Sequence, residues 1–175
     1  MKRILLFSIV LFIAVATQAQ NATVTKVRQL YADAKQEIAK REQNAKEGQN
    51  PNDLVVTSNY YAQGSGPAHD ETHYYHSSSY NERLMTVFYR PFFITRKYNV
   101  GAQEFYQEFL FDDQNEGKLV FYFQKNPDGE TRYYYGENGL AHEIVKGERA
   151  FDEATVQRLA TDLCEAFDKL MNREY

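Results

Sequence analysis

The chain has very little cysteine, which excludes a disulfide framework. Cys164 is the only cysteine, so no bridge can form within the molecule, and a domain of this size can fold on an apolar core without one. Cys164 lies in the segment ATDLCEAFDKL, next to an apolar helical stripe, where a buried and inert thiol is the usual outcome. We therefore expect no catalytic role for this thiol.

An excess of basic charge is also missing. The chain has 20 Lys and Arg against 24 Asp and Glu, which gives a formal net charge of −4. A nucleic-acid-binding face has to be basic because it contacts phosphates, and a helix that lies on an anionic membrane needs a basic amphipathic stripe. We expect no nucleic acid among the partners and, after removal of the N-terminal segment described next, no membrane.

Only one long apolar run occurs, and it is too short to span a bilayer. Residues 4–16 are almost entirely apolar, but these 13 residues fall short of the roughly 20 that a membrane span requires. Two basic residues precede the run, and the small residues Thr17 and Ala19 follow it at the −3 and −1 positions. This pattern is typical of a secretory signal peptide. We predict that residues 1–19 are cleaved off, which leaves residues 20–175 as one exported domain, periplasmic or extracellular and without a lipid anchor.

The motifs of common enzyme classes are absent as well. The sequence contains no Gly-x-Ser-x-Gly nucleophile elbow, no phosphate-binding loop and no dinucleotide fingerprint. Glu104 and Glu108 share one strand face, but four residues along a strand separate them by about 13 Å, which exceeds the spacing of a glycosidase pair. A solvated pair of carboxylates is the simpler interpretation. We predict neither a catalytic residue nor a cofactor.

Two segments have the periodicity of an amphipathic helix. Residues 22–47 and residues 152–173 each carry one apolar stripe, and Asp152 is a suitable N-cap for the second segment. The stripes consist of Val24, Val27, Leu30, Tyr31, Ala34 and Ile38 in the first segment, and of Val156, Leu159, Ala160, Leu163, Phe167, Leu170 and Met171 in the second.

Between these helices the apolar period drops toward two and tyrosine becomes frequent. Twelve of the 14 tyrosines lie between Tyr60 and Tyr135, and aromatic residues favour strands. Pro91 is expected to break or bend the chain between the third and fourth strands. Short turns rich in Asn, Asp, Gly and Pro join the last four strands, which predicts antiparallel neighbours. We predict eight strands, near residues 54–62, 71–78, 82–90, 93–99, 103–112, 118–125, 130–136 and 139–146.

The order of helix, many strands and helix predicts an α+β fold. A sheet with one apolar face has to bury that face against another element. The simplest arrangement is an antiparallel meander of hairpins with the N-terminal and C-terminal amphipathic helices packed together on one sheet face.

The stretch AHDETHYYHSSSY, residues 68–80, raises the question of a metal site. It is a poor helix former, and on a strand His69 and His73 would lie about 13 Å apart, while His73 and His76 would point to opposite faces. A zinc ion needs three or four ligands that converge at about 2 Å. We therefore predict no metal here, and the candidates, should one bind, are His69, Asp70, His73 and His76.

The tyrosine-rich strands suggest a recognition surface. Tyrosines beside arginines provide large rigid contact areas with polar tips. One sheet face would then display Tyr106, Tyr122 and Tyr134 together with Arg90 and Arg132. The alternative is that tyrosine simply packs the sheet and that helices cover both faces. The sequence leaves both interpretations open.

Three functions are compatible with these observations. The first is an exported, non-catalytic module that binds a protein, peptide or glycan through its sheet face or loops. The second is a structural or assembly component of the bacterial cell envelope, which would use a sheet edge or the polar end of the first helix. The third is a metal-dependent hydrolase built on the stretch from His69 to His76. The abundance of aromatic residues and the lack of catalytic motifs favour the first.

Overall fold

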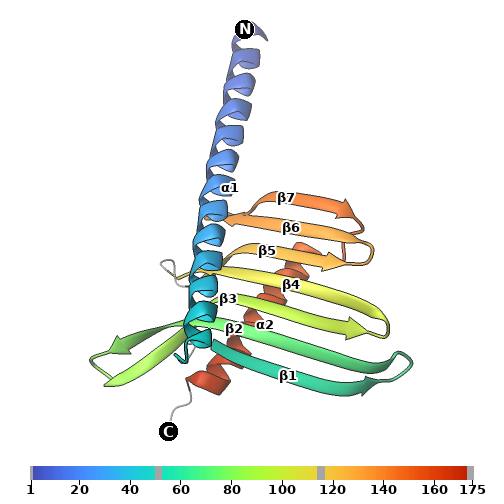
Figure 1. Ribbon diagram of the computed structural model, residues 1–175. Helices are drawn as coiled ribbons and strands as arrows, with labels where there is room; N and C mark the ends of the chain where they lie inside the picture. The colour runs from blue at the N-terminus through green and yellow to red at the C-terminus, as the bar shows by residue number, and fades with distance from the viewer. Residues whose placement is uncertain (1, 50–52, 114–116, 173–175) are drawn as a thin grey trace.

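The computed structural model describes residues 2–49, 53–113 and 117–172 (Figure 1). Seven strands form one antiparallel sheet in which every strand lies next to its neighbours in sequence. This arrangement confirms the α+β meander with an N-terminal and a C-terminal helix. The elements are α1 (Lys2–Lys46), β1 (Asp53–Ala62), β2 (Gly66–Asn81), β3 (Thr86–Val100), β4 (Gln103–Asp112), β5 (Lys118–Asn126), β6 (Gly129–Gly136), β7 (Gly139–Gly147) and α2 (Glu153–Met171).

The two helices cover opposite faces of the sheet, which corrects the expectation that both would pack on one face. Both helices cross the strands, with α1 in front of the sheet and α2 behind it (Figure 1). One apolar cluster joins α1 to Phe93, Leu110 and Phe121. A second joins α2 to Ile94 and Tyr122. The clusters use neighbouring residues of the same strands, and neighbouring residues point to opposite faces.

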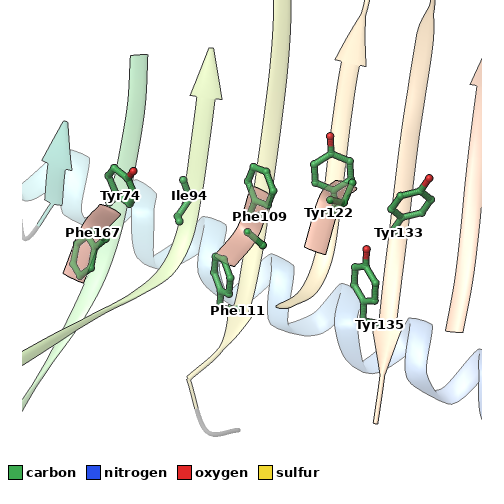
Figure 2. Packing of buried hydrophobic residues seen from close by; sticks show 10 residues of the cluster. Tyr74, Ile94, Phe109, Phe111, Tyr122, Tyr133, Tyr135 and Phe167 are labelled. Carbon is green, nitrogen blue, oxygen red and sulfur yellow. The ribbon is translucent and has the colours of Figure 1, made fainter. Parts of the chain in front are cut away.

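Two-sided burial explains why the strands carry runs of aromatic residues. Tyr122 packs under α2 and its neighbour Phe121 under α1. The same division separates Tyr133 from Tyr134. Figure 2 shows Tyr74, Ile94, Phe109, Tyr122 and Tyr133 in a single row across successive strands. A strand that is buried on both faces needs a nearly continuous apolar run, whereas one-sided burial requires alternation.

The helices form where the apolar stripes predicted them. In α2, the carboxylate of Asp152 accepts a hydrogen bond from the Thr155 backbone at 2.8 Å and caps the first turn. Phe167 is fully buried on this stripe. The last residue predicted for this helix, Arg173, lies outside the described residues. In α1, the first buried side chain among those described is Val24, and the part of the helix before it projects past β7 (Figure 1).

The strand prediction was wrong around Pro91. The two strands expected at 82–90 and 93–99 are one strand, β3, which continues through Pro91. Proline is tolerated there because this part of β3 pairs only with β2 and because Phe92 forms a bulge opposite the Tyr75–His76 step. The ends of β2 and β3 consequently form a hairpin arm that extends beyond the other strands (Figure 1). Neither helix, over the residues searched, is apolar enough along its length to cross a membrane.

Candidate functional site

The sheet face under α1 is only partly covered by the helix. α1 crosses the strands near one of their ends, and the half of this face toward the β3–β4 and β5–β6 hairpins carries no helix (Figure 1). A row of side chains runs across this open half at matching register positions. The row consists of Glu71 in β2, Lys97 in β3, Tyr106 in β4, Lys125 in β5, Glu130 in β6 and Lys146 in β7.

A buried carboxylate marks the border between α1 and this open half. Glu108 in β4 is only 4% exposed. Its oxygens accept hydrogen bonds from the hydroxyl groups of Tyr31 at 2.8 Å and Tyr106 at 2.7 Å, and the Lys35 ammonium lies 3.4 Å away. A buried charge is tolerated when it is paired and hydrogen-bonded. The three donors therefore compensate for the burial of this carboxylate between helix and sheet.

The two tyrosines of this cluster are fixed as hydrogen-bond donors. Burial, and in second place the hydrogen bond to Glu108, raise the pKa of Tyr31 and of Tyr106 well above the ordinary tyrosine value. Both hydroxyls are therefore protonated at neutral pH. Tyr106 is half-buried, so its ring is held in one orientation while part of it faces the open half of the sheet.

Next to Tyr106 lies an open groove of about 880 Å³ at the hairpin end of the sheet. Four charged side chains line it, two acidic and two basic, and within the described part of the chain none of the four forms an ion pair. Charged groups that have no partner in the free protein can pair with a ligand. Its lining includes Glu71, Lys97, Glu104, Tyr106, Lys125 and the exposed His69.

A smaller cavity of about 250 Å³ lies on the other side of Glu108. Its wall includes Arg132, whose guanidinium stacks over the Phe123 ring at 4.7 Å and pairs with Glu130 at 3.1 Å. Arg28 of α1 lies over the ring of Tyr134, 5.9 Å from its centre. These cation–π contacts hold both guanidinium groups near the protein surface.

A third cavity, of about 760 Å³, lies between the two helices at the other end of the strands. Among its lining groups are the hydroxyl of Tyr135, which is buried and has no hydrogen-bond partner among the described residues, and Cys164. Burial raises the pKa of the Cys164 thiol to about 11. The thiol is therefore protonated at neutral pH and a poor nucleophile.

The structure does not gather the predicted surface residues on one exposed face. Tyr106 and Arg132 lie on the α1 face and are half-buried. Tyr134 is on the same face but packs under α1, and Tyr122 is fully buried on the opposite face under α2. Arg90 is exposed on the hairpin arm, beside Gly117. Of the five, only Tyr106 faces the open half of the sheet, and Arg132 lies at its border, in the cross-strand row of Glu108 and beside α1.

The four candidate metal ligands divide between the two faces. His73 stacks on Tyr75 of the α1 face, whereas His76 packs against Phe167 of α2, which confirms that these two histidines point in opposite directions. Asp70 is bound by the guanidinium of Arg96 on the α2 face. His69 is exposed and lies near Asn59. Over the described residues, no group of three or more potential ligands converges on one point.

The strand pattern alone does not predict the role of Glu108. It indicates a solvated carboxylate pair with Glu104, but only Glu104 is exposed. Two of the donors to Glu108, Tyr31 and Lys35, come from α1 and lie 77 and 73 residues before it in the sequence. One signal was present: Tyr31 places a polar hydroxyl on an otherwise apolar helical stripe, and a buried tyrosine needs a hydrogen-bond partner.

Comparisons of the chain with models of protein families, with curated proteins and with solved structures found no match.

Proposed function

We propose that the chain is an exported, non-catalytic binding module that recognises its ligand on the open half of the α1 face. The observation that carries this proposal is the groove beside Tyr106, where Glu71, Lys97, Glu104 and Lys125 have no ion-pair partners in the described chain. Four unpaired charges around a fixed aromatic ring contribute little to the stability of the fold, but they can form ion pairs with a ligand.

The mixed charge of the groove favours a particular class of ligand. A nucleic acid or another polyanion needs a basic site, whereas this groove has two acidic and two basic side chains in addition to His69. A protein segment or peptide that carries both signs of charge fits this pattern. A glycan is the other ligand class, since it could stack on the exposed part of Tyr106 and bond to the surrounding polar groups.

Export is part of the proposal and rests on the N-terminal sequence. The basic start, the short apolar run and the small residues before Gln20 have the organisation of a signal peptide. The first half of α1 projects past β7 (Figure 1), and the first buried side chain of this helix among those described is Val24. Removal of residues 1–19 would therefore leave the contacts between α1 and the sheet in place.

A charge-reversal experiment tests the proposed binding face. Peptide and glycan arrays would be probed with the mature protein and with Lys97→Glu/Lys125→Glu. The matched control is Lys40→Glu/Arg158→Glu, which makes the same change in net charge at exposed positions of the two helices. We expect ligands that bind the wild type and the control but not the groove variant. Ligands that bind all three proteins equally would contradict a site in this groove.

An assembly role in the cell envelope is the second candidate, and the hairpin arm of β2 and β3 favours it. The arm carries the exposed apolar side chains Tyr80, Leu84, Met85 and Phe88, and Met85 adopts a left-handed backbone conformation with φ of 50°, which is uncommon outside glycine. Projecting apolar residues typically mark contact sites. If the arm holds the protein in an assembly, Leu84→Ser/Met85→Ser should release it from the sedimenting envelope fraction of the native host, while the groove variant should stay bound.

A further inference from the structure

Apart from Asp53 at its start, which pairs with His73, the free edge of β1 lacks the features that protect sheet edges. Among the described residues, β1 pairs only with β2. The nine residues from Leu54 to Ala62 contain no charge and no proline. Side chains on both faces are exposed, up to 78% for Tyr61. Natural proteins usually block such edges with charges, proline, bulges or a covering element, because an open edge pairs with other strands.

The other edge strand, β7, is protected in the usual way. It carries Glu143 and Lys146, and Glu143 is held by the guanidinium of Arg149. Val145 lies in the same cross-strand row as Val56 of β1, at the opposite end of the sheet. The two valines have the same exposure, 37%. The sheet therefore has one blocked edge and one open edge.

The sequence of β1 is complementary to itself in one antiparallel register. When Ser58 faces Ser58 of a second copy, Val56 faces Tyr60 and Val55 faces Tyr61. Each copy then contributes a β-branched residue opposite an aromatic residue on both faces of the sheet, and such cross-strand pairs stabilise antiparallel strands. A shift of the centre to Thr57 would instead place Tyr61 opposite Asp53 and Val55 opposite Asn59. Only the register centred on Ser58 pairs both valines with both tyrosines.

We propose that β1 pairs with β1 of a second copy around a twofold axis at Ser58, so that the two seven-stranded sheets form one continuous sheet. Twofold symmetry keeps like faces together, so both α1 helices lie on one side of the combined sheet and both α2 helices on the other. The proposal is independent of the groove beside Tyr106, whose lining begins at β2, one strand in from this edge, and which would be present twice on the same face of the dimer.

Matched edge variants test the interface by sedimentation of the mature protein over a range of concentrations. We expect a dimer for the wild type, a monomer for Val56→Lys and a dimer for Val145→Lys, because a lysine on an edge strand opposes strand pairing and only the first variant lies in the proposed interface. A wild type that is monomeric at every concentration would overturn the proposal. A dimer that Val145→Lys disrupts, or that Val56→Lys leaves intact, would overturn it as well.

Single cysteines test the register in a Cys164→Ala background. Ser58→Cys should form a disulfide-linked dimer on mild oxidation. The two copies of residue 58 lie directly opposite each other at the twofold axis, and the Cα separation of such a pair falls within the 4.4–6.8 Å that a disulfide allows. Val56→Cys and Tyr60→Cys point to the same face as Ser58 but should not cross-link alone, since each lies about 13 Å from its symmetry copy. A mixture of these two proteins should cross-link. Equal cross-linking at all three positions would refute the register, and binding of an unrelated extended peptide by a monomeric wild type would assign the edge to another partner.

Discussion

Tyr31 of α1 donates a hydrogen bond to the carboxylate of Glu108 in β4, with 2.8 Å between the two oxygens. The contact joins the first helix to the centre of the sheet. It also fixes one side of the cluster whose other member, Tyr106, faces the open groove. The arrangement of the proposed binding face therefore depends on a helix that contributes no side chain to the groove itself.

Removal of the Tyr31 hydroxyl should destabilise the protein. Glu108 would lose one of its donors while it stays buried, and leaving a buried acceptor short of a partner costs about 1–3 kcal/mol. We expect Tyr31→Phe to lower the free energy of unfolding by that amount in chemical denaturation. Tyr80→Phe, at an exposed position of the hairpin arm, is the matched control and should stay within about 0.5 kcal/mol of the wild type. Equal effects of the two changes would show that the hydrogen bond is not a stabilising contact.

Phe167 should be among the most sensitive positions of α2. Its ring is fully buried and packs 5.5 Å from the ring of Tyr74 (Figure 2). Truncation leaves a cavity between helix and sheet, so Phe167→Ala should cost about 3–5 kcal/mol of unfolding free energy. Leu170→Ala, three residues along the same helix but exposed, should change the unfolding free energy by about 0.5 kcal/mol or less. A small effect at Phe167 would mean that α2 is peripheral.

The helices and the antiparallel order of the strands could be predicted because their signals are local. Asp152 caps α2, and the apolar stripe from Val156 to Phe167 shows which side of the helix is buried. The sidedness of the helices could not be predicted with the same rules. It depends on whether adjacent aromatic residues such as Phe121 and Tyr122 are both buried, and two helices can satisfy that need only from opposite faces.

The candidate site was predictable only in part for a related reason. A strand pattern shows that Tyr106 and Glu108 share a face, but it does not show where a helix from elsewhere in the chain crosses that face. α1 covers Tyr134 and leaves Tyr106 at its border, so two tyrosines that have the same strand parity have different environments. Register and helix placement are long-range properties, and residue composition does not determine them.

His76 should make the stability of the protein depend on pH. Its ring is buried between Tyr89 and Phe167, and burial lowers the pKa of the imidazole below its ordinary value. The unfolded chain therefore binds a proton more readily than the folded one, so unfolding free energy is lost as the pH falls through about 6.5. Arg41, which donates a hydrogen bond to the His76 carbonyl, acts in the same direction on the pKa.

The measurement is chemical unfolding on both sides of that pH. His76→Phe keeps the ring contacts and removes the titrating group, so its loss of stability on acidification should be smaller than that of the wild type. His69→Asn, at an exposed position, should behave like the wild type. An unchanged pH dependence in His76→Phe would show that another group is responsible.

Removal of metal ions should leave the stability unchanged. The candidate ligands His73 and His76 point to opposite faces, and a structural zinc site couples metal binding to folding. Thermal melting of the purified protein with and without excess chelator should therefore give the same midpoint. Stoichiometric zinc in the protein, together with a lower midpoint after chelation, would refute this prediction and would favour the hydrolase hypothesis for the stretch from His69 to His76.

Export predicts a defined N-terminus for the mature protein. The small residues Thr17 and Ala19 follow the apolar run at the positions that signal peptidases require, so cleavage should occur before Gln20. The intact mass of the protein from its native host should therefore lack residues 1–19.

A charged side chain at the −1 position should block processing, so Ala19→Lys should accumulate as the full-length form. Ala22→Lys, at an exposed position three residues after the cut, is the control and should be processed normally. A full-length, membrane-bound species as the main form of the wild type would contradict the prediction, because the apolar segment would then act as an anchor despite its length.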